Sequence, residues 1–335
     1  MRFFKKKIYM IAKGSLILLS NGTFKKIEDI KEEDIVWTMK ENFKISSAKV
    51  IKVKKQEEKE CLQILNNLEI TKDQPIYCSA RNHKPSGYFS LENLKEKDKV
   101  LLFNLKYAAK NSLEFKRGYL RGFVDGDGHI GNRSIFTCQK EKDILVEFWN
   151  IYKEVIEDTS TKIIYDEKRN IYIGEGGYSK KFKELTKINF NEEYAKGYLN
   201  GMLIADGCAA YNKANNFFRF VLTQSFSANK IKCENIEKML DILDISFSKW
   251  NSTNKGFLKE KGNVNYYNIP KPWKIPLIYG SSKKDKMIKK INTYGSLKFM
   301  PKKTIKKIIS IGKRKMYYID TETHTFFANG ILVHS

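Results

Sequence analysis

The sequence has few of the residues that build disulfides and structural zinc sites. Five cysteines and four histidines occur among 335 residues, and no two cysteines are spaced as Cys-x-x-Cys. The absence of such a pair argues against a structural zinc site. A small, odd number of cysteines is typical of proteins from a reducing compartment. We therefore expect an intracellular protein, in either the nucleus or the cytoplasm.

Long apolar runs are also missing. No run reaches the roughly 18 to 20 residues that span a bilayer, and no apolar stretch follows the basic N-terminal residues as it would in a signal peptide. Hydrophobic residues still make up 41% of the chain, which is enough to form a core. The length favours two or more domains, and we expect no membrane association.

Basic residues outnumber acidic ones, 62 to 38, which gives a formal net charge of +24. This charge favours a polyanionic partner, because lysine and arginine neutralise phosphates and release counterions. Most of the charge is lysine, which the coding bias of an AT-rich genome also produces. A basic protein at a membrane surface is the main alternative, but no amphipathic anchor helix stands out.

The two ends of the chain show the pattern of β-strands. Short apolar runs predict strands at 16–19, 35–37, 50–53 and 100–103, with a hairpin turn at Asn21-Gly22. Further strands are predicted at 317–319, 326–327 and 331–333. The segment between them mixes helices and strands, so we expect a discontinuous β domain with an inserted domain.

Within the insertion, one order of elements occurs twice. A helix from Ser112 is followed by a strand at 134–139, a helix with apolar residues at 144, 145, 148 and 149, strands at 162–165 and 171–173, and a short helix near 181–185. The second copy begins at Asn191, an expected N-cap. It continues with a strand at 220–224 and a helix with apolar residues at Ile231, Ile236, Met239, Leu240 and Leu243. Two copies predict a pseudo-twofold αββαββα pair.

Each copy carries one helix-ending motif, at 120–128 and at 199–207, with aspartates Asp127 and Asp206 that are 79 residues apart. Gly122 and Gly201 lack side chains, so two such helices can pack with their backbones close together. The final glycine of each motif is expected in C-cap position. A single motif of this kind is equally well a glycine-terminated amphipathic helix, but two copies at repeat spacing favour a shared site.

Two aspartates that emerge from parallel helices would converge. Like charges this close are costly unless cations bridge them, and Mg²⁺ is the natural oxygen-ligated partner. Two such ions about 4 Å apart can hold the attacking water and the leaving oxygen of a phosphodiester.

The two motifs resemble those of the LAGLIDADG homing endonucleases. The second copy departs at Ile204, where the family has an acid. The resemblance implies that Asp127 and Asp206 bind two or three divalent ions, chiefly Mg²⁺, with the backbone carbonyls of Gly126 and Ala205. It also implies a monomer with internal pseudo-twofold symmetry that cuts both strands of a long DNA site and reads it with β-ribbons.

The family also has a glutamine after the first strand and a lysine late in each repeat. Gln139 and Gln224 lie on equivalent predicted strands, although each is also an ordinary exposed strand residue. Lys187 and Lys284 match the late positions, where a lysine would polarise water or offset charge on the scissile phosphate. In a chain this rich in lysine, a solvated surface charge is the competing interpretation for both.

The two end segments resemble the Hint domain of self-splicing inteins. Residues 10–18 resemble its start, with Met10 at the nucleophile position, and residues 70–75 resemble its Thr-x-x-His block, with Gln74 in place of histidine. Residues 326–335 resemble the terminal block, where His334 is kept and Ser335 replaces the cyclising asparagine. A thioether cannot undergo an acyl shift, glutamine has no imidazole, and serine has no carboxamide. We therefore predict that splicing is lost.

These patterns predict an α+β fold, in which a discontinuous all-β Hint-like domain at 1–107 and 301–335 is interrupted by an endonuclease domain at 108–300. The two repeats would cover about 112–190 and 191–300. The predicted activity is Mg²⁺-dependent cleavage of double-stranded DNA at a specific site, with the Hint-like domain helping to grip the DNA. A non-cleaving nucleic-acid binder and a splicing-competent intein are the alternatives.

Overall fold

The computed structural model describes residues 9–40, 44–80, 86–103, 112–212, 217–255, 261–269, 289 and 302–335. The chain divides into two compact units. Unit 1 comprises Met1–Ala108 and Gly295–Ser335, and unit 2 comprises Ala109–Tyr294. The sequence placed these boundaries at 107/108 and 300/301. Among the described residues, none of the helices combines the length and apolar character needed to cross a bilayer.

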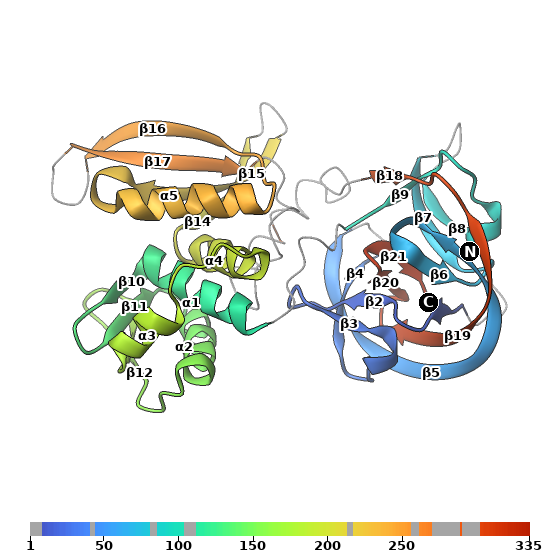
Figure 1. The fold of residues 1–335 in the computed structure, drawn as a ribbon, viewed down its shortest axis with the longest axis horizontal. Helices are drawn as coiled ribbons and strands as arrows, with labels where there is room; N and C mark the ends of the chain where they lie inside the picture. Colours follow the sequence, from blue (N-terminus) through green and yellow to red (C-terminus); the bar gives the residue numbers. More distant parts are fainter. Residues whose placement is uncertain are drawn as a thin grey trace. The chain divides into compact units, whose positions relative to one another are not determined.

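Unit 1 is built from strands and three short 3₁₀ helices (Figure 1). Its strands before the insertion are β1 (Ile11–Ala12), β2 (Leu16–Leu18), β3 (Phe24–Lys26), β4 (Ile35–Met39), β5 (Ile45–Ile64), β6 (Leu68–Ile70), β7 (Pro75–Ala80), β8 (Gly87–Ser90) and β9 (Lys99–Leu101). Those after it are β18 (Lys302–Thr304), β19 (Ile309–Thr321), β20 (Thr325–Ala328) and β21 (Ile331–His334). The 3₁₀ helices are Ile27–Asp29, Leu65–Asn67 and Leu91–Asn93. Each strand predicted from the sequence is present.

The strands of unit 1 form two sheets that mix the two ends of the chain. One has the order β19-β1-β6-β5-β4, and the other has the order β18-β9-β7-β21-β20-β2-β3, with β8 paired to β7. The predicted Asn21-Gly22 turn joins β2 to β3, and Gly22 has a φ of 83°, which glycine adopts without strain. Apolar side chains from both ends fill one core, so neither end can complete the domain alone.

Unit 2 contains two successive copies of one element order. The first is α1 (Leu113–Asp127), β10 (Gly128–Ile130), β11 (Ile135–Gln139), α2 (Lys142–Ile156), β12 (Lys162–Asp166), β13 (Ile171–Gly176) and α3 (Ser179–Leu185). The second is α4 (Glu192–Ala205), β14 (Gly207–Asn212), β15 (Phe217–Ser225), α5 (Phe226–Ile242), β16 (Ser248–Lys255) and β17 (Lys261–Ile269). The sheets have matching orders, β10-β11-β13-β12 and β14-β15-β17-β16, and Figure 1 shows α5 lying along the β16–β17 ribbon.

Most local predictions in unit 2 are confirmed, but the one for Ile231 is wrong. The Asn191 side chain caps α4 by accepting from the Tyr194 N–H at 2.8 Å. Ile231, expected on the apolar face of α5, is 72% exposed. It lies five residues before the buried Ile236, on the opposite side of a helix with 3.6 residues per turn. The sequence patterns also did not single out β10 and β14, which follow directly from the motif helices.

Candidate active site

The two motif helices of unit 2 pack with their backbones in contact. A Cβ added to Gly118 would lie 2.2 Å from the Tyr194 carbonyl oxygen, and one added to Gly122 would lie 2.0 Å from that of Tyr198. Carbon and oxygen cannot approach so closely, so only glycine permits this separation of α1 and α4. Gly122, which the sequence singled out, is therefore required by helix packing, and so is Gly118, which it did not single out.

Glycines of α4 make the same kind of contact with the backbone of α1. A Cβ on Gly197 would lie 2.0 Å from the Phe115 carbonyl oxygen, and one on Gly201 would lie 2.2 Å from that of Tyr119. Each contact from α1 to α4 thus has a counterpart from α4 to α1 at an offset of 79 residues. This reciprocity means that the helices run parallel and that their C-terminal ends lie together.

At these ends, the residues that precede the two aspartates face each other. A Cβ on Gly126 would lie 2.4 Å from the Ala205 Cβ and 3.4 Å from Oδ2 of Asp206. The missing side chain of Gly126 leaves room beside the Asp206 carboxylate. Asp127 and Asp206 are both partly buried.

The two helices end differently. Gly128 is the C-cap of α1 as predicted, but α4 ends at Ala205 and its C-cap is Asp206, so the prediction that Gly207 caps α4 is wrong by one residue. At both glycines the backbone lies too close to the preceding helical turn for a side chain. A Cβ on Gly128 would lie 2.7 Å from the Val124 Cα. On Gly207 it would lie 2.5 Å from the Leu203 carbonyl oxygen.

Asp125, the other acid of the first motif, is a packing residue. It is 3% exposed, and both of its carboxylate oxygens accept from Nε of Arg121 at 3.1 Å. The Tyr198 hydroxyl donates to Oδ2 at 2.9 Å. Burial raises the pKa of Tyr198 and the nearby Asp125 carboxylate raises it further, so this hydroxyl stays a donor. The second motif has Ile204 at the equivalent position, buried and apolar.

The two predicted glutamines lie beside the two aspartates. Nε2 of Gln139, on β11, donates to Oδ2 of Asp127. Nε2 of Gln224, on β15, is 3.5 Å from Oδ2 of Asp206. Nδ2 of Asn229 donates to Oε1 of Gln224 at 2.9 Å. The structure thus brings together one aspartate and one glutamine from each repeat.

Neither of the two predicted lysines is placed beside the aspartates by a contact among the described residues. Lys187 follows α3, its side chain is exposed, and its N–H donates to the Glu184 carbonyl at 3.4 Å. Lys284 lies outside the described residues. The sequence missed Lys232 on α5, whose Nζ donates to the main-chain carbonyl of Asp125 at 2.7 Å. No local pattern could distinguish this lysine among so many others.

The site suits a hard divalent cation. Two carboxylates lie where two parallel helices end, and a helix C-terminus carries a partial negative charge. The described residues contain no group of three or more His, Cys, Asp or Glu side chains that could hold a metal ion. Mg²⁺ in proteins is commonly bound by one or two carboxylates and retains several waters. Asp127 and Asp206, with main-chain carbonyls such as those of Gly126 and Ala205, match that donor set.

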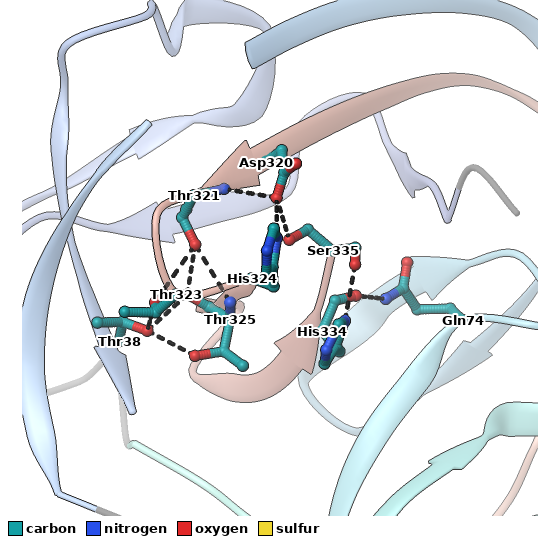
Figure 2. A network of polar contacts seen from close by, with 9 residues as sticks. All are labelled: Thr38, Gln74, Asp320, Thr321, Thr323, His324, Thr325, His334 and Ser335. Carbon is teal, nitrogen blue, oxygen red and sulfur yellow. Dashed lines mark hydrogen bonds and ion pairs between the residues drawn. The ribbon is translucent and has the colours of Figure 1, made fainter. Parts of the chain in front are cut away.

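Unit 1 gathers the four positions that resemble a splicing site. Met10 is fully buried beside Ala12, Cys61 and Met316. Its carbonyl oxygen accepts from the Thr71 N–H at 3.1 Å, and the Thr71 carbonyl accepts from the Gln74 N–H. Nε2 of Gln74 donates to the His334 carbonyl at 2.6 Å, and Ser335 follows directly (Figure 2).

Two further residues of this group were not singled out from the sequence. Asp320, at the end of β19, accepts from the Ser335 hydroxyl at 2.7 Å and lies 2.9 Å from Nδ1 of His324. The His324 ring stacks on that of His334, with centroids 6.1 Å apart (Figure 2). Histidine is rare in this chain, and two histidines within eleven residues were the available signal.

Comparison with known proteins gives remote likenesses only. No protein-family model matches the chain, and no curated protein matches it. Among solved structures, a variant of the Ssp DnaB mini-intein has 10% identity and a TM-score of 0.36 over 99% of this chain and 97% of its own. The DnaB intein of Synechocystis sp. PCC 6803 has 11% identity and a TM-score of 0.34, with 98% of each chain covered. Mesophilic variants of the homing endonuclease I-DmoI have 17% identity and a TM-score of 0.36, over 50% of this chain and 89% of theirs. Likenesses this weak decide nothing about function.

Proposed function

We propose that this protein is a site-specific homing endonuclease that makes a Mg²⁺-dependent double-strand break in a long DNA target. The observation that carries the proposal is the reciprocal glycine packing of α1 and α4, which delivers Asp127 and Asp206 to one place. Two equivalent carboxylates related by a pseudo-twofold axis match a duplex, whose two strands present equivalent phosphodiesters. One chain therefore supplies both halves of the site and acts as a monomer.

The residues around the aspartates have distinct roles in this proposal. Asp127 and Asp206 hold the ions, and Gln139 and Gln224 fix the carboxylates in orientation through their amide groups. Bound ions supply the activated water and the neutralisation of charge on the leaving oxygen. Lys187 and Lys284 remain candidates for offsetting charge on the scissile phosphate, and Lys232 joins them because it already lies beside the motif.

The charge of the chain supports DNA as the partner. A formal net charge of +24 allows many phosphate contacts, and long-range attraction speeds association with DNA. The Hint-like unit 1 adds to this grip but no longer splices, because Met10, Gln74 and Ser335 lack the groups that the splicing steps use.

The test is cleavage by the purified full chain. We expect linear product from plasmids that carry the locus uninterrupted by this gene, in the presence of Mg²⁺ and not of EDTA. Asp127→Asn and Asp206→Asn should each lower the cleavage rate by at least about 10³-fold while DNA binding persists, since the ions neutralise the transition-state charge. The matched control is Asp241→Asn, an exposed acid on α5, which should cut normally.

Two results would contradict the proposal. Retention of cleavage by both aspartate variants would remove the metal role. Tight binding to the locus by the folded chain, with no nick in either strand at any Mg²⁺ or Mn²⁺ concentration, would make the protein a non-cleaving binder.

A further inference from the structure

The β16–β17 ribbon of unit 2 presents an aromatic pair on its open face, which is the face opposite α5 (Figure 1). Tyr267 is fully buried, and its hydroxyl donates to the Cys233 carbonyl of α5 at 3.4 Å. Successive side chains of a strand point to opposite faces. Tyr266 and its cross-strand partner Trp250 therefore lie on the open face. Trp250 is 39% exposed, and the two rings stack with centroids 5.1 Å apart and 6° between their planes.

The β12–β13 ribbon presents an isoleucine pair in the same manner. Ile164 pairs with Ile173 across the two strands. The next residue, Gly174, faces α2, because a Cβ there would lie 1.8 Å from Nε1 of Trp149. Ile173 and Ile164 therefore lie on the face opposite α2, and Ile164 is 53% exposed.

The two pairs occupy equivalent positions in the two repeats. Each pair continues a row that begins one residue before a glutamine of the candidate active site, Gln139 or Gln224. The rows are Cys138–Ile173–Ile164 in the first repeat and Thr223–Tyr266–Trp250 in the second. Two strand spacings carry each row about 10 Å outward from the site. The pseudo-twofold relation thus places one apolar pair on each side of the candidate active site.

The setting of these pairs indicates what they contact. A formal net charge of +24 favours duplex DNA as the partner, and the major groove of B-DNA admits a two-stranded β-ribbon. The base edges in that groove present hydrogen-bond donors and acceptors, and their apolar group is the C5-methyl of thymine. An aliphatic or aromatic surface against a donor or acceptor would leave that polar group desolvated and unpaired, which is costly.

We infer that the isoleucine pair and the aromatic pair each contact the C5-methyl group of a thymine in the major groove, one in each half of the target. The inference rests on the proposed function, because it requires a duplex bound along both ribbons. It adds to that function the base that the two equivalent positions select. The pairs act on binding specificity and take no part in bond cleavage.

The experiment compares thymine with uracil, which lacks only the methyl group. The probe is the uninterrupted locus amplified with dUTP in place of dTTP, and binding of the full chain is measured without divalent ions so that neither strand is cut. A single uracil at the contacted position of either half should weaken binding about fourfold, as for one buried methyl-sized group. The fully substituted duplex should bind about 10-fold more weakly or worse, because distant contacts add.

Variants assign each preference to its ribbon. Trp250→Ser should abolish the preference for thymine over uracil in one half of the target and leave it in the other half, and Ile164→Ser should do the reverse. The matched control is Ile309→Ser, which changes an exposed isoleucine on β19 of unit 1 and should keep both preferences. A cross-strand pair that only stabilises its sheet would change the unfolding free energy and not the thymine-to-uracil ratio. Circular dichroism of each variant reports folding.

The outcomes separate this inference from the proposed function. Equal affinity for thymine and uracil DNA would overturn the inference and leave the endonuclease proposal standing. A thymine preference that persists unchanged in both ribbon variants would overturn it as well. If the folded chain neither binds nor cuts the locus, the proposed function fails and the inference fails with it.

Discussion

Residues of the same type have opposite roles in this chain according to what surrounds them. Asp125 and Asp127 belong to one motif, yet Asp125 is buried against Arg121 and Tyr198 whereas Asp127 lies at the helix end beside Gln139. An acid that is buried and ion-paired is tied to the fold, because leaving its partner uncompensated is costly. In the proposed function, the acid at the helix end is the one that binds a cation.

At the same scale, His334 should make the stability of unit 1 depend on pH. Burial lowers the pKa of His334 below its usual 6.5. The unfolded chain therefore takes up a proton at a higher pH than the folded chain does. The free energy of unfolding should be fully maintained above pH 6.5 and should fall as the pH drops below it.

Urea unfolding measured across this pH range checks the effect. His334→Gln should remove most of the decline, while the matched control His129→Gln, an exposed histidine in unit 2, should retain it. An unchanged decline in His334→Gln would assign it to other groups.

Among elements, the α1–α4 pair packs with the two helix backbones in direct contact. Four glycines, Gly118, Gly122, Gly197 and Gly201, each face a carbonyl oxygen of the other helix. Large side chains such as Phe123 and Leu203 fill the flanks of this contact and are fully buried. The position of both aspartates therefore depends on the missing Cβ atoms as much as on the acids.

We predict that Gly122→Ala destabilises unit 2 strongly. The new Cβ would lie 2.0 Å from the Tyr198 carbonyl oxygen, which belongs to a helix backbone that cannot move alone. The free energy of unfolding of unit 2 should fall by about 3 kcal/mol or more, at the upper end of the range for overpacked cores. The matched control is Gly177→Ala, where the nearest atom would be 3.5 Å away.

Thermal and urea unfolding of both variants measure the difference. The free energy of unfolding of the Gly177→Ala variant should lie within about 0.5 kcal/mol of that of the original protein, because the new methyl group meets no other atom closely. Equal stability of the two variants would show that α1 and α4 are not packed in backbone contact.

In the whole molecule, unit 2 is inserted between two neighbouring strands of unit 1. β9 pairs antiparallel with β18, so that Leu101 lies opposite Lys302. The chain leaves unit 1 and returns to it at adjacent points, and the core of unit 1 draws on both segments. Such an insertion imposes little loop-closure cost on the host domain.

We therefore expect that residues 1–103, joined by a short glycine-serine linker to residues 302–335, fold as a β domain. Far-UV circular dichroism should show strands, and unfolding should be a single cooperative transition. The control is a shorter protein that also omits β9 and β18 and should be less stable. If the protein that retains β9 and β18 is unfolded under the same conditions, unit 1 requires the insertion in order to fold.

The sequence by itself determined the local features of this protein: the strands of unit 1, the repeated element order of unit 2, the Asn191 cap and the paired motif helices. These follow from periodicity, turn residues and capping, which act over a few neighbouring positions. Only the tertiary structure decided which acid is buried, that Gln139 and Gln224 reach the aspartates, and that Lys232 lies beside the motif while Lys187 is exposed. It alone placed Asp320 and His324 at Ser335. Such contacts join residues far apart in the chain, and no local pattern encodes the packing that brings them together.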